Sequence, residues 1–183
     1  MEDESLKKAI EEKLYLVDHN PEWLLRFTKE CERLRALLKG ASCKIRHVGS
    51  TAIPGLKAKP VVDIIVGFES LEVADALIPR LLDGGYVTSD EFNSTLPDRR
   101  WLMKHKDGKR LFHLHLVVQN SPIWNEYVGF TTILQDNPTA RDEYQQLKEE
   151  LVATSDGDRD AYTSSKRAFI LRWLNSASIS VSE

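Results

Sequence analysis

One stretch, residues 47–66, constrains the fold more than any other part of the chain. It reads as a strand end, a polar loop with glycine, proline and lysine, and an almost wholly apolar strand whose single acid is Asp63. A buried carboxylate without a partner costs several kcal/mol, so a charged or hydrogen-bonding group must meet Asp63. Small residues in the loop let the backbone approach a phosphate, and its lysines can neutralise one. We therefore expect the active or binding site here.

The composition fits one globular domain over residues 1–183, with residues 1–13 and 176–183 as loose ends. A formal net charge of −3 gives no electrostatic reason to expect binding to bulk nucleic acid or to a membrane surface. The two cysteines, Cys31 and Cys43, lack metal-site spacing and cannot build a disulfide framework. The sequence start lacks signal-peptide features, and no apolar run reaches membrane-spanning length. We expect a cytoplasmic protein.

Apolar periodicity predicts the elements around this stretch. The predicted helices cover residues 1–13, 21–39, 71–82 and 122–134, with two more beginning at 138 and near 158. The predicted strands cover residues 43–48 and 60–68, briefly 14–17 and 86–87, and a hairpin of 99–105 with 110–118, while 90–98 is expected to be a loop. This order predicts an α+β (α/β-like) domain with a mixed β-sheet core, helices packed on it and a C-terminal helical segment.

Two histidines form the second group of candidate functional residues. His113 and His115 alternate along their predicted strand, so both side chains face one side, about 7 Å apart. If that face also carries Asp63, the three side chains could hold a transition metal or bind a phosphate. The alternative is a solvent-facing or hydrogen-bonded pair of histidines in a half-exposed strand.

A two-metal centre for phosphoryl transfer needs a second carboxylate beside Asp63. Residues two apart on a strand share a face, but the neighbouring positions hold Val61 and Ile65. Arg99 and Arg100 point to opposite faces of their strand, so one of them at most can reach a given site. No P-loop, dinucleotide-binding, zinc-protease or nucleophile-elbow motif is present, which excludes several common enzyme classes.

The sequence resembles the GrpB family, which is placed in the nucleotidyltransferase superfamily. Residues 47–66 carry the resemblance, being similar to the signature H-[IV]-G-S-T-x-[VI]-P-G-L-x-x-K-P-x-x-D-[IL]. Four shorter segments agree with the family pattern: residues 16–23, 96–101, 113–116 and 158–166. The last contains Tyr162 and Lys166, one helical turn apart, which by themselves would suggest a packing tyrosine beside a snorkelling lysine.

The resemblance implies a nucleotidyltransferase-like fold. Gly49 and Ser50 would end one strand and open a helix or loop over a triphosphate, and the next strand would carry metal-binding acids. Asp63 matches the first acid, Ile65 occupies the place of the second, and Arg46 stands where the family commonly has glutamate. Both departures weaken the case for two Mg²⁺ ions. The resemblance therefore supplies a fold more securely than an activity.

Our leading hypothesis is a protein that binds a small phosphorylated ligand, a nucleotide above all. Its expected ligand-binding residues are Gly49, Ser50, Thr51, Lys59, Arg99, Arg100 and Lys166. Its expected catalytic and metal-binding residues are Asp63, His113 and His115, with Mg²⁺ or Mn²⁺ as the metal. The reaction, if there is one, would be metal-assisted nucleotidyl or phosphoryl transfer.

Two alternatives stay open at this point. The first is a non-catalytic ligand-sensing or partner-binding module on the same fold, which the absence of an acid at position 65 favours. The second is a metal-dependent hydrolase built on the two histidines and Asp63. The sequence decides neither between an enzyme and a binding module nor the oligomeric state.

Overall fold

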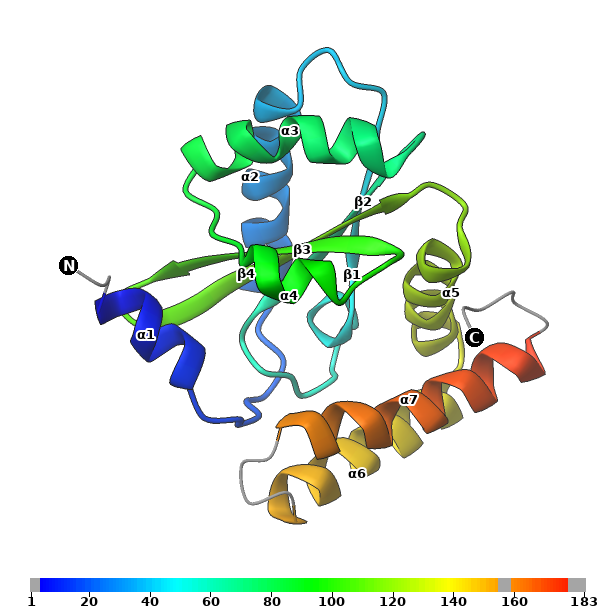
Figure 1. Cartoon of the computed structure of the whole chain (residues 1–183). Coiled ribbons are helices and arrows are strands. Elements are labelled where there is room, and N and C mark those ends of the chain that lie inside the picture. Colours follow the sequence, from blue (N-terminus) through cyan, green and yellow to red (C-terminus); the bar gives the residue numbers. More distant parts are fainter. Residues whose placement is uncertain (1–3, 155–158, 178–183) are drawn as a thin grey trace.

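The computed structural model describes residues 4–154 and 159–177. Its elements in chain order are α1 (Glu4–Glu11), α2 (Glu22–Leu37), β1 (Lys44–Val48), the 3₁₀ turn η1 (Ser50–Ala52), β2 (Val62–Phe68), α3 (Leu71–Asp83), α4 (Asp90–Ser94), β3 (Arg99–Lys106), β4 (Lys109–Val118), α5 (Pro122–Asp136), α6 (Pro138–Thr154) and α7 (Arg159–Ser176) (Figure 1). The predicted α+β class, with a C-terminal helical segment, is confirmed.

The sheet has four strands in the order β1-β2-β4-β3. β1 pairs with β2 antiparallel, β2 with β4 parallel, and β3 with β4 antiparallel. A parallel pair needs a crossover, which here runs through α3, α4 and β3. The predicted mixed sheet and the predicted hairpin are therefore both present.

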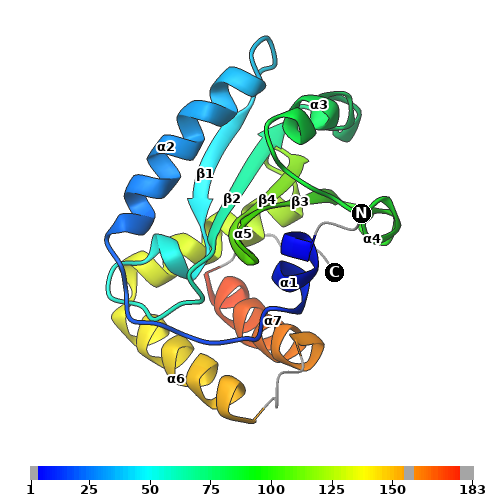
Figure 2. The same cartoon turned by 90° about the vertical axis from the view of Figure 1, so that its left-hand side faces the viewer.

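The two faces of the sheet are covered differently (Figures 1 and 2). Helices α2 and α3 cover one face and bury the main apolar core, while α5 covers the other face. The main core includes Leu34, Ile64, Leu81, Leu114 and Leu116, each fully buried. Alternation along β2 and β4 leaves Asp63, His113 and His115 on the α5 side.

The three C-terminal helices also pack against the loop between β1 and β2. Ile53 and Leu56 of this loop are buried in a separate apolar cluster. That cluster also contains Phe130 of α5, Tyr144 of α6 and Phe169 of α7. The C-terminal segment therefore holds the loop against the edge of the sheet.

Three local predictions differ from the structure. The predicted strands at 14–17 and 86–87 are only isolated bridges, Val17 with Ala58 and Val87 with Met103, because each makes a single residue pairing. The predicted loop at 90–98 contains α4, which begins where the Ser89 hydroxyl accepts a hydrogen bond from the Phe92 amide at 3.1 Å.

The helix predicted near the start of the chain is present as α1. The Arg110 side chain donates to the Ala9 carbonyl at 2.9 Å, and the Gly108 amide donates to the Ser5 hydroxyl at 2.9 Å. These contacts hold residues 4–11 on the β3–β4 hairpin. The sequence predicted a loose end here and gave no sign of these contacts. Residues 178–183 lie outside the described part.

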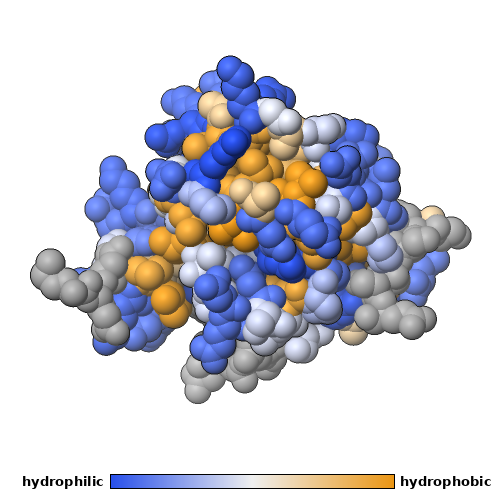
Figure 3. Space-filling view, turned by 45° about the horizontal axis from the view of Figure 1, so that its top comes forward, coloured by the Kyte–Doolittle hydropathy of each residue, from blue (hydrophilic) through white to orange (hydrophobic). Residues whose placement is uncertain are grey.

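Several large hydrophobic side chains of the described residues are exposed. They belong to four different helices and are Ile10, Leu24, Leu25, Leu82 and Phe92. On the face drawn in Figure 3, hydrophilic side chains border the hydrophobic areas. No helix in the described ranges is long and apolar enough to cross a membrane.

Candidate functional site

Asp63 and His113 form a hydrogen-bonded pair in the middle of the sheet. They are direct neighbours in the β2–β4 register, and His113 Nδ1 lies 3.0 Å from Asp63 Oδ1. Burial alone would raise the pKa of Asp63, but the hydrogen bond and charge of His113 outweigh it and lower the pKa. An ionised carboxylate only accepts, so Nδ1 carries the proton and donates it to Asp63. The other ring nitrogen, Nε2, is buried and has no hydrogen-bond partner within the structure described.

His115 is the more deeply buried of the two histidines. Its neighbour in β2 is Ile65, and its ring centre lies 4.8 Å from that of Tyr127 on α5. Burial lowers the pKa of His115 to about 3, so its ring is neutral at pH 7. Burial also raises the pKa of Tyr127 to about 12, which leaves this phenol protonated.

The turn after β1 passes directly over Asp63. Gly49 has φ +73°, and a Cβ at this position would lie 2.8 Å from Asp63 Oδ2. Glycine is needed here for both the positive φ and the close approach. The Gly49 amide donates to the Thr131 hydroxyl of α5 at 3.2 Å, so α5 fixes the turn.

His47 positions the next part of the turn. Its Nε2 lies 3.0 Å from the Thr51 hydroxyl, and its ring stacks on Phe27 with centres 4.8 Å apart. Burial lowers the pKa of His47 to about 4, so the ring is neutral at pH 7. The structure therefore gives the His47 ring a part in ordering the turn.

Lys148 on α6 reaches under the loop and was not among the predicted site residues. Its side chain donates to the Lys57 carbonyl and, at 3.3 Å, to the Ser50 hydroxyl. The residue is 1% exposed, and burial lowers its pKa to about 7, with Lys166 adding to the effect. A signal existed in the sequence, because Lys148 interrupts an apolar stripe one turn after Tyr144.

Lys166 comes to the same region from α7. Burial lowers the pKa of Lys166 to about 8, and the nearby Asp63 charge partly opposes this shift. The predicted residues Asp63, Ser50 and Lys166 therefore converge on one region, together with Lys148. The side chain of Tyr162 lies outside the described part of the chain.

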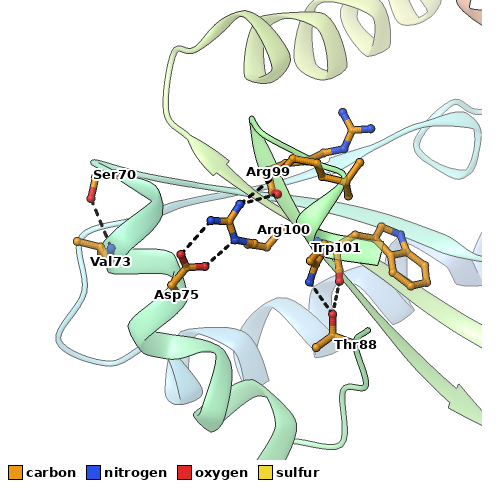
Figure 4. Close-up of polar contacts among 9 residues, drawn as sticks. Ser70, Val73, Asp75, Thr88, Arg99, Arg100 and Trp101 are labelled. Carbon is orange, nitrogen blue, oxygen red and sulfur yellow. Dashed lines mark hydrogen bonds and ion pairs between the residues drawn. The ribbon is translucent and has the colours of Figure 1, made fainter. Parts of the chain in front are cut away.

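Arg99 and Arg100 separate as expected for neighbours on a strand. Arg100 makes a two-pronged ion pair with Asp75 of α3, with distances of 2.7 and 3.0 Å (Figure 4). The Arg99 side chain points away from that pair, and its charge acts on His115 and Tyr127. Arg99 is thus the arginine on the side of the candidate site.

The loop lysines already have carboxylate partners. Lys59 forms an ion pair with Glu12 at 3.0 Å, and Lys57 forms one with Glu149 at 3.0 Å. The charge of Lys59, which was expected to neutralise a phosphate, is therefore compensated within the protein.

The donor set fits a preformed divalent-metal centre poorly. Over residues 4–154 and 159–177, no group of three or more His, Cys, Asp or Glu side chains is arranged to hold a metal ion. Asp63 has one oxygen on His113 and the other against the backbone of Gly49, and Ile65 supplies no oxygen. The expected Mg²⁺ or Mn²⁺ on Asp63, His113 and His115 stays a prediction. Hydroxyls and ammonium groups around a small turn suit an anion better.

Comparison with known proteins supports one family. A relative from Alkalihalophilus pseudofirmus, "Glutamate-rich protein GrpB", is 33% identical over 164 residues, covering 87% of this chain and 93% of the relative. A dephospho-CoA kinase from Mycolicibacterium paratuberculosis is 31% identical over 173 residues, covering 82% of this chain and 42% of the kinase. This chain therefore spans less than half the length of that relative.

A solved structure and a family model agree with these relatives. The crystal structure of the conserved protein GrpB from Enterococcus faecalis has a TM-score of 0.71 and 29% identity, covering 87% of this chain and 99% of that one. The family model described as "GrpB protein" matches residues 13–176. These residues include the turn, the Asp63–His113 pair and both lysines, and the chain belongs to the GrpB family.

Proposed function

We propose that this protein binds a nucleotide or another small phosphorylated ligand over residues 49–51. The observation that carries this proposal is the convergence of two lysines, the buried Lys148 and the half-buried Lys166, on the Ser50 turn and Asp63. A phosphate accepts several hydrogen bonds and carries the negative charge that ammonium groups bind.

Each polar group around the turn has a role in this proposal. The Ser50 hydroxyl, half-buried beside Lys148, donates to a phosphate oxygen, and the absence of a side chain at Gly49 lets the ligand approach closely. Lys166 neutralises phosphate charge, and Arg99 clamps the ligand from β3. Lys59 and Arg100 keep their present carboxylate partners.

The relatives suggest which ligands to test first. GrpB proteins are placed in the nucleotidyltransferase superfamily, which makes nucleoside triphosphates natural candidates. One relative is a dephospho-CoA kinase, although this chain matches only 42% of it. ATP, GTP and dephospho-CoA therefore form the first panel.

Isothermal titration calorimetry of the whole chain tests the proposal. We expect saturable binding of at least one of the three ligands, weakened about tenfold in Lys166→Met, because one charge-assisted hydrogen bond is worth about 1.5 kcal/mol. Lys44→Met is the matched control, since Lys44 is exposed on β1 and should leave binding unchanged. If none of the three ligands binds, the proposal is wrong.

A second candidate function is metal-assisted nucleotidyl or phosphoryl transfer at the same place. It is favoured by the His113 ring, which Asp63 orients so that Nε2 is left without a partner. If Asp63 holds a metal, Asp63→Asn should abolish any stimulation of binding or turnover by Mg²⁺ or Mn²⁺. A pure binding module should bind equally well with and without these ions. Metal analysis of the purified protein tests the hydrolase alternative, which requires bound Zn, Mn or Fe.

A further inference from the structure

Lys148 differs from the other lysines around the loop in what surrounds its charge. Lys57 has Glu149 and Lys59 has Glu12 as ion-pair partners. Lys148 is the most buried of the three, yet its hydrogen bonds in the described structure go to two neutral oxygens, the Lys57 carbonyl and the Ser50 hydroxyl. An ammonium group has three protons to donate, so one is left beyond these two contacts.

A buried ammonium without a counter-charge is costly to keep charged. Burial and the nearby Lys166 lower the pKa of Lys148, and Glu149, whose carboxylate contacts Lys57, opposes this only in part. Burial also lowers the pKa of Lys166, and the nearby Asp63 charge opposes this shift. Both lysines attract an anion at the turn and repel a further cation there.

The position of Asp63 points the same way. One of its oxygens accepts from His113, and the other faces the Gly49 backbone. A divalent ion there would share the Asp63 carboxylate with His113 and would lie near the Lys166 charge. Ile65 offers nothing in compensation, since a second acid is absent from that position.

We propose that Lys148, together with Lys166, supplies the counter-charge for the ligand's phosphate at Ser50, so that binding needs no divalent metal ion. This inference rests on the proposed function and deepens it by naming what balances the ligand charge. Lys148 acts from beneath the turn, where it both holds the Ser50 hydroxyl and places a positive charge behind it.

Calorimetry with ATP, GTP and dephospho-CoA, each in EDTA and in excess Mg²⁺, tests ligand binding and its independence of metal separately. We expect a ligand to bind in EDTA with an affinity that Mg²⁺ does not improve. Binding confined to the Mg²⁺ arm would overturn the metal-free inference and leave the proposed function standing. Absence of binding in both arms would overturn the proposed function itself.

Substitutions of Lys148 test the residue directly. Lys148→Gln keeps a hydrogen-bond donor near Ser50 but removes the charge, and we expect it to weaken binding in EDTA about tenfold. Lys148→Arg, which keeps the charge, should recover much of the affinity. Lys104→Gln is the matched control, because Lys104 is also largely buried but pairs with Glu30 at 2.8 Å, away from the turn.

The outcome of these variants is decisive in either direction. A Lys148→Gln protein that is folded by circular dichroism and binds like the original chain would refute the role of Lys148. An equal loss of affinity in Lys148→Gln and in Lys148→Arg would show that the shape of the lysine matters and its charge does not, and would refute it as well.

Discussion

Two lysines, Lys104 and Lys148, lie over tyrosine rings in almost the same way but in opposite electrostatic surroundings. Lys104 Nζ lies 5.1 Å from the Tyr86 ring centre, and Lys148 Nζ lies 5.0 Å from that of Tyr144. Lys104 has Glu30 at 2.8 Å, and the Tyr86 hydroxyl donates to the same carboxylate at 2.9 Å. The contacts described for Lys148 include no carboxylate.

The two lysines differ in whether a carboxylate contacts their ammonium group. Lys104 of β3, Glu30 of α2 and Tyr86, which follows α3, form a polar network in which the lysine contacts a carboxylate directly. Lys148 ends at a turn that also approaches Asp63, the hydrogen-bond partner of His113. A fold keeps such an uncompensated group at a cost, which is why perturbed charges gather at functional sites.

The largest expected effect comes from breaking the balanced network. Lys104→Met leaves the buried Glu30 carboxylate with only the longer contact to Arg33, at 3.9 Å, and should lower the free energy of unfolding by about 3 kcal/mol. Lys148→Met strands no opposite charge and should cost about 1 kcal/mol or less, mainly through lost hydrogen bonds to the turn. Urea denaturation measures both. Equal losses in the two variants would show that the two lysines are not different in kind.

How much of the site could be predicted from the sequence depends on how far apart in the chain the interacting residues lie. The common face of His113 and His115 follows from strand alternation, which is local and strict. The presence of Asp63 on that face depends on strand pairing, which the sequence alone left conditional. The structure supplies it through the register of β2 and β4.

The partners of the charged residues could not be predicted, because they lie far apart in sequence. Lys59 pairs with Glu12, Arg100 with Asp75, and Lys148 meets Ser50 across 98 positions. A charged residue on a helix is usually solvated, so Lys148 offered only one hint, its place in an apolar stripe. Which charges remain uncompensated emerges only from the folded arrangement.

Two glycines of the loop between β1 and β2 provide a second comparison, with a smaller expected effect. Gly49 and Gly55 both have positive φ, +73° and +80°, so alanine pays a similar backbone cost at each. Only at Gly49 does a Cβ meet another group, Asp63 Oδ2 at 2.8 Å, whereas nothing lies within 4 Å at Gly55. Gly49→Ala should therefore lower the free energy of unfolding by about 2 kcal/mol more than Gly55→Ala.

Ligand binding gives a second measurement on the same pair of variants. Gly49→Ala moves the turn away from Asp63 and should weaken binding at least about tenfold. Gly55→Ala should leave it nearly unchanged. If both variants bind equally well, the close approach of the turn to Asp63 has no part in ligand recognition.

The smallest expected effect is a dependence of stability on pH that comes from Lys148. The pKa of Lys148 is lowered from 10.5 to about 7 in the folded chain, so the unfolded chain binds more protons between these values. The stability contribution of Lys148 should therefore rise with pH, by about 1 kcal/mol between about pH 7.5 and 8.5. The comparison is between the original chain and Lys148→Met. Lys166 and Glu149, the charges that act on Lys148, are present in both proteins, so their own titration largely cancels in the difference between the two unfolding free energies. Parallel curves of unfolding free energy against pH for the two proteins would mean that Lys148 titrates like an exposed lysine. The different contacts of Lys148 and Lys104 would then have no electrostatic effect on stability.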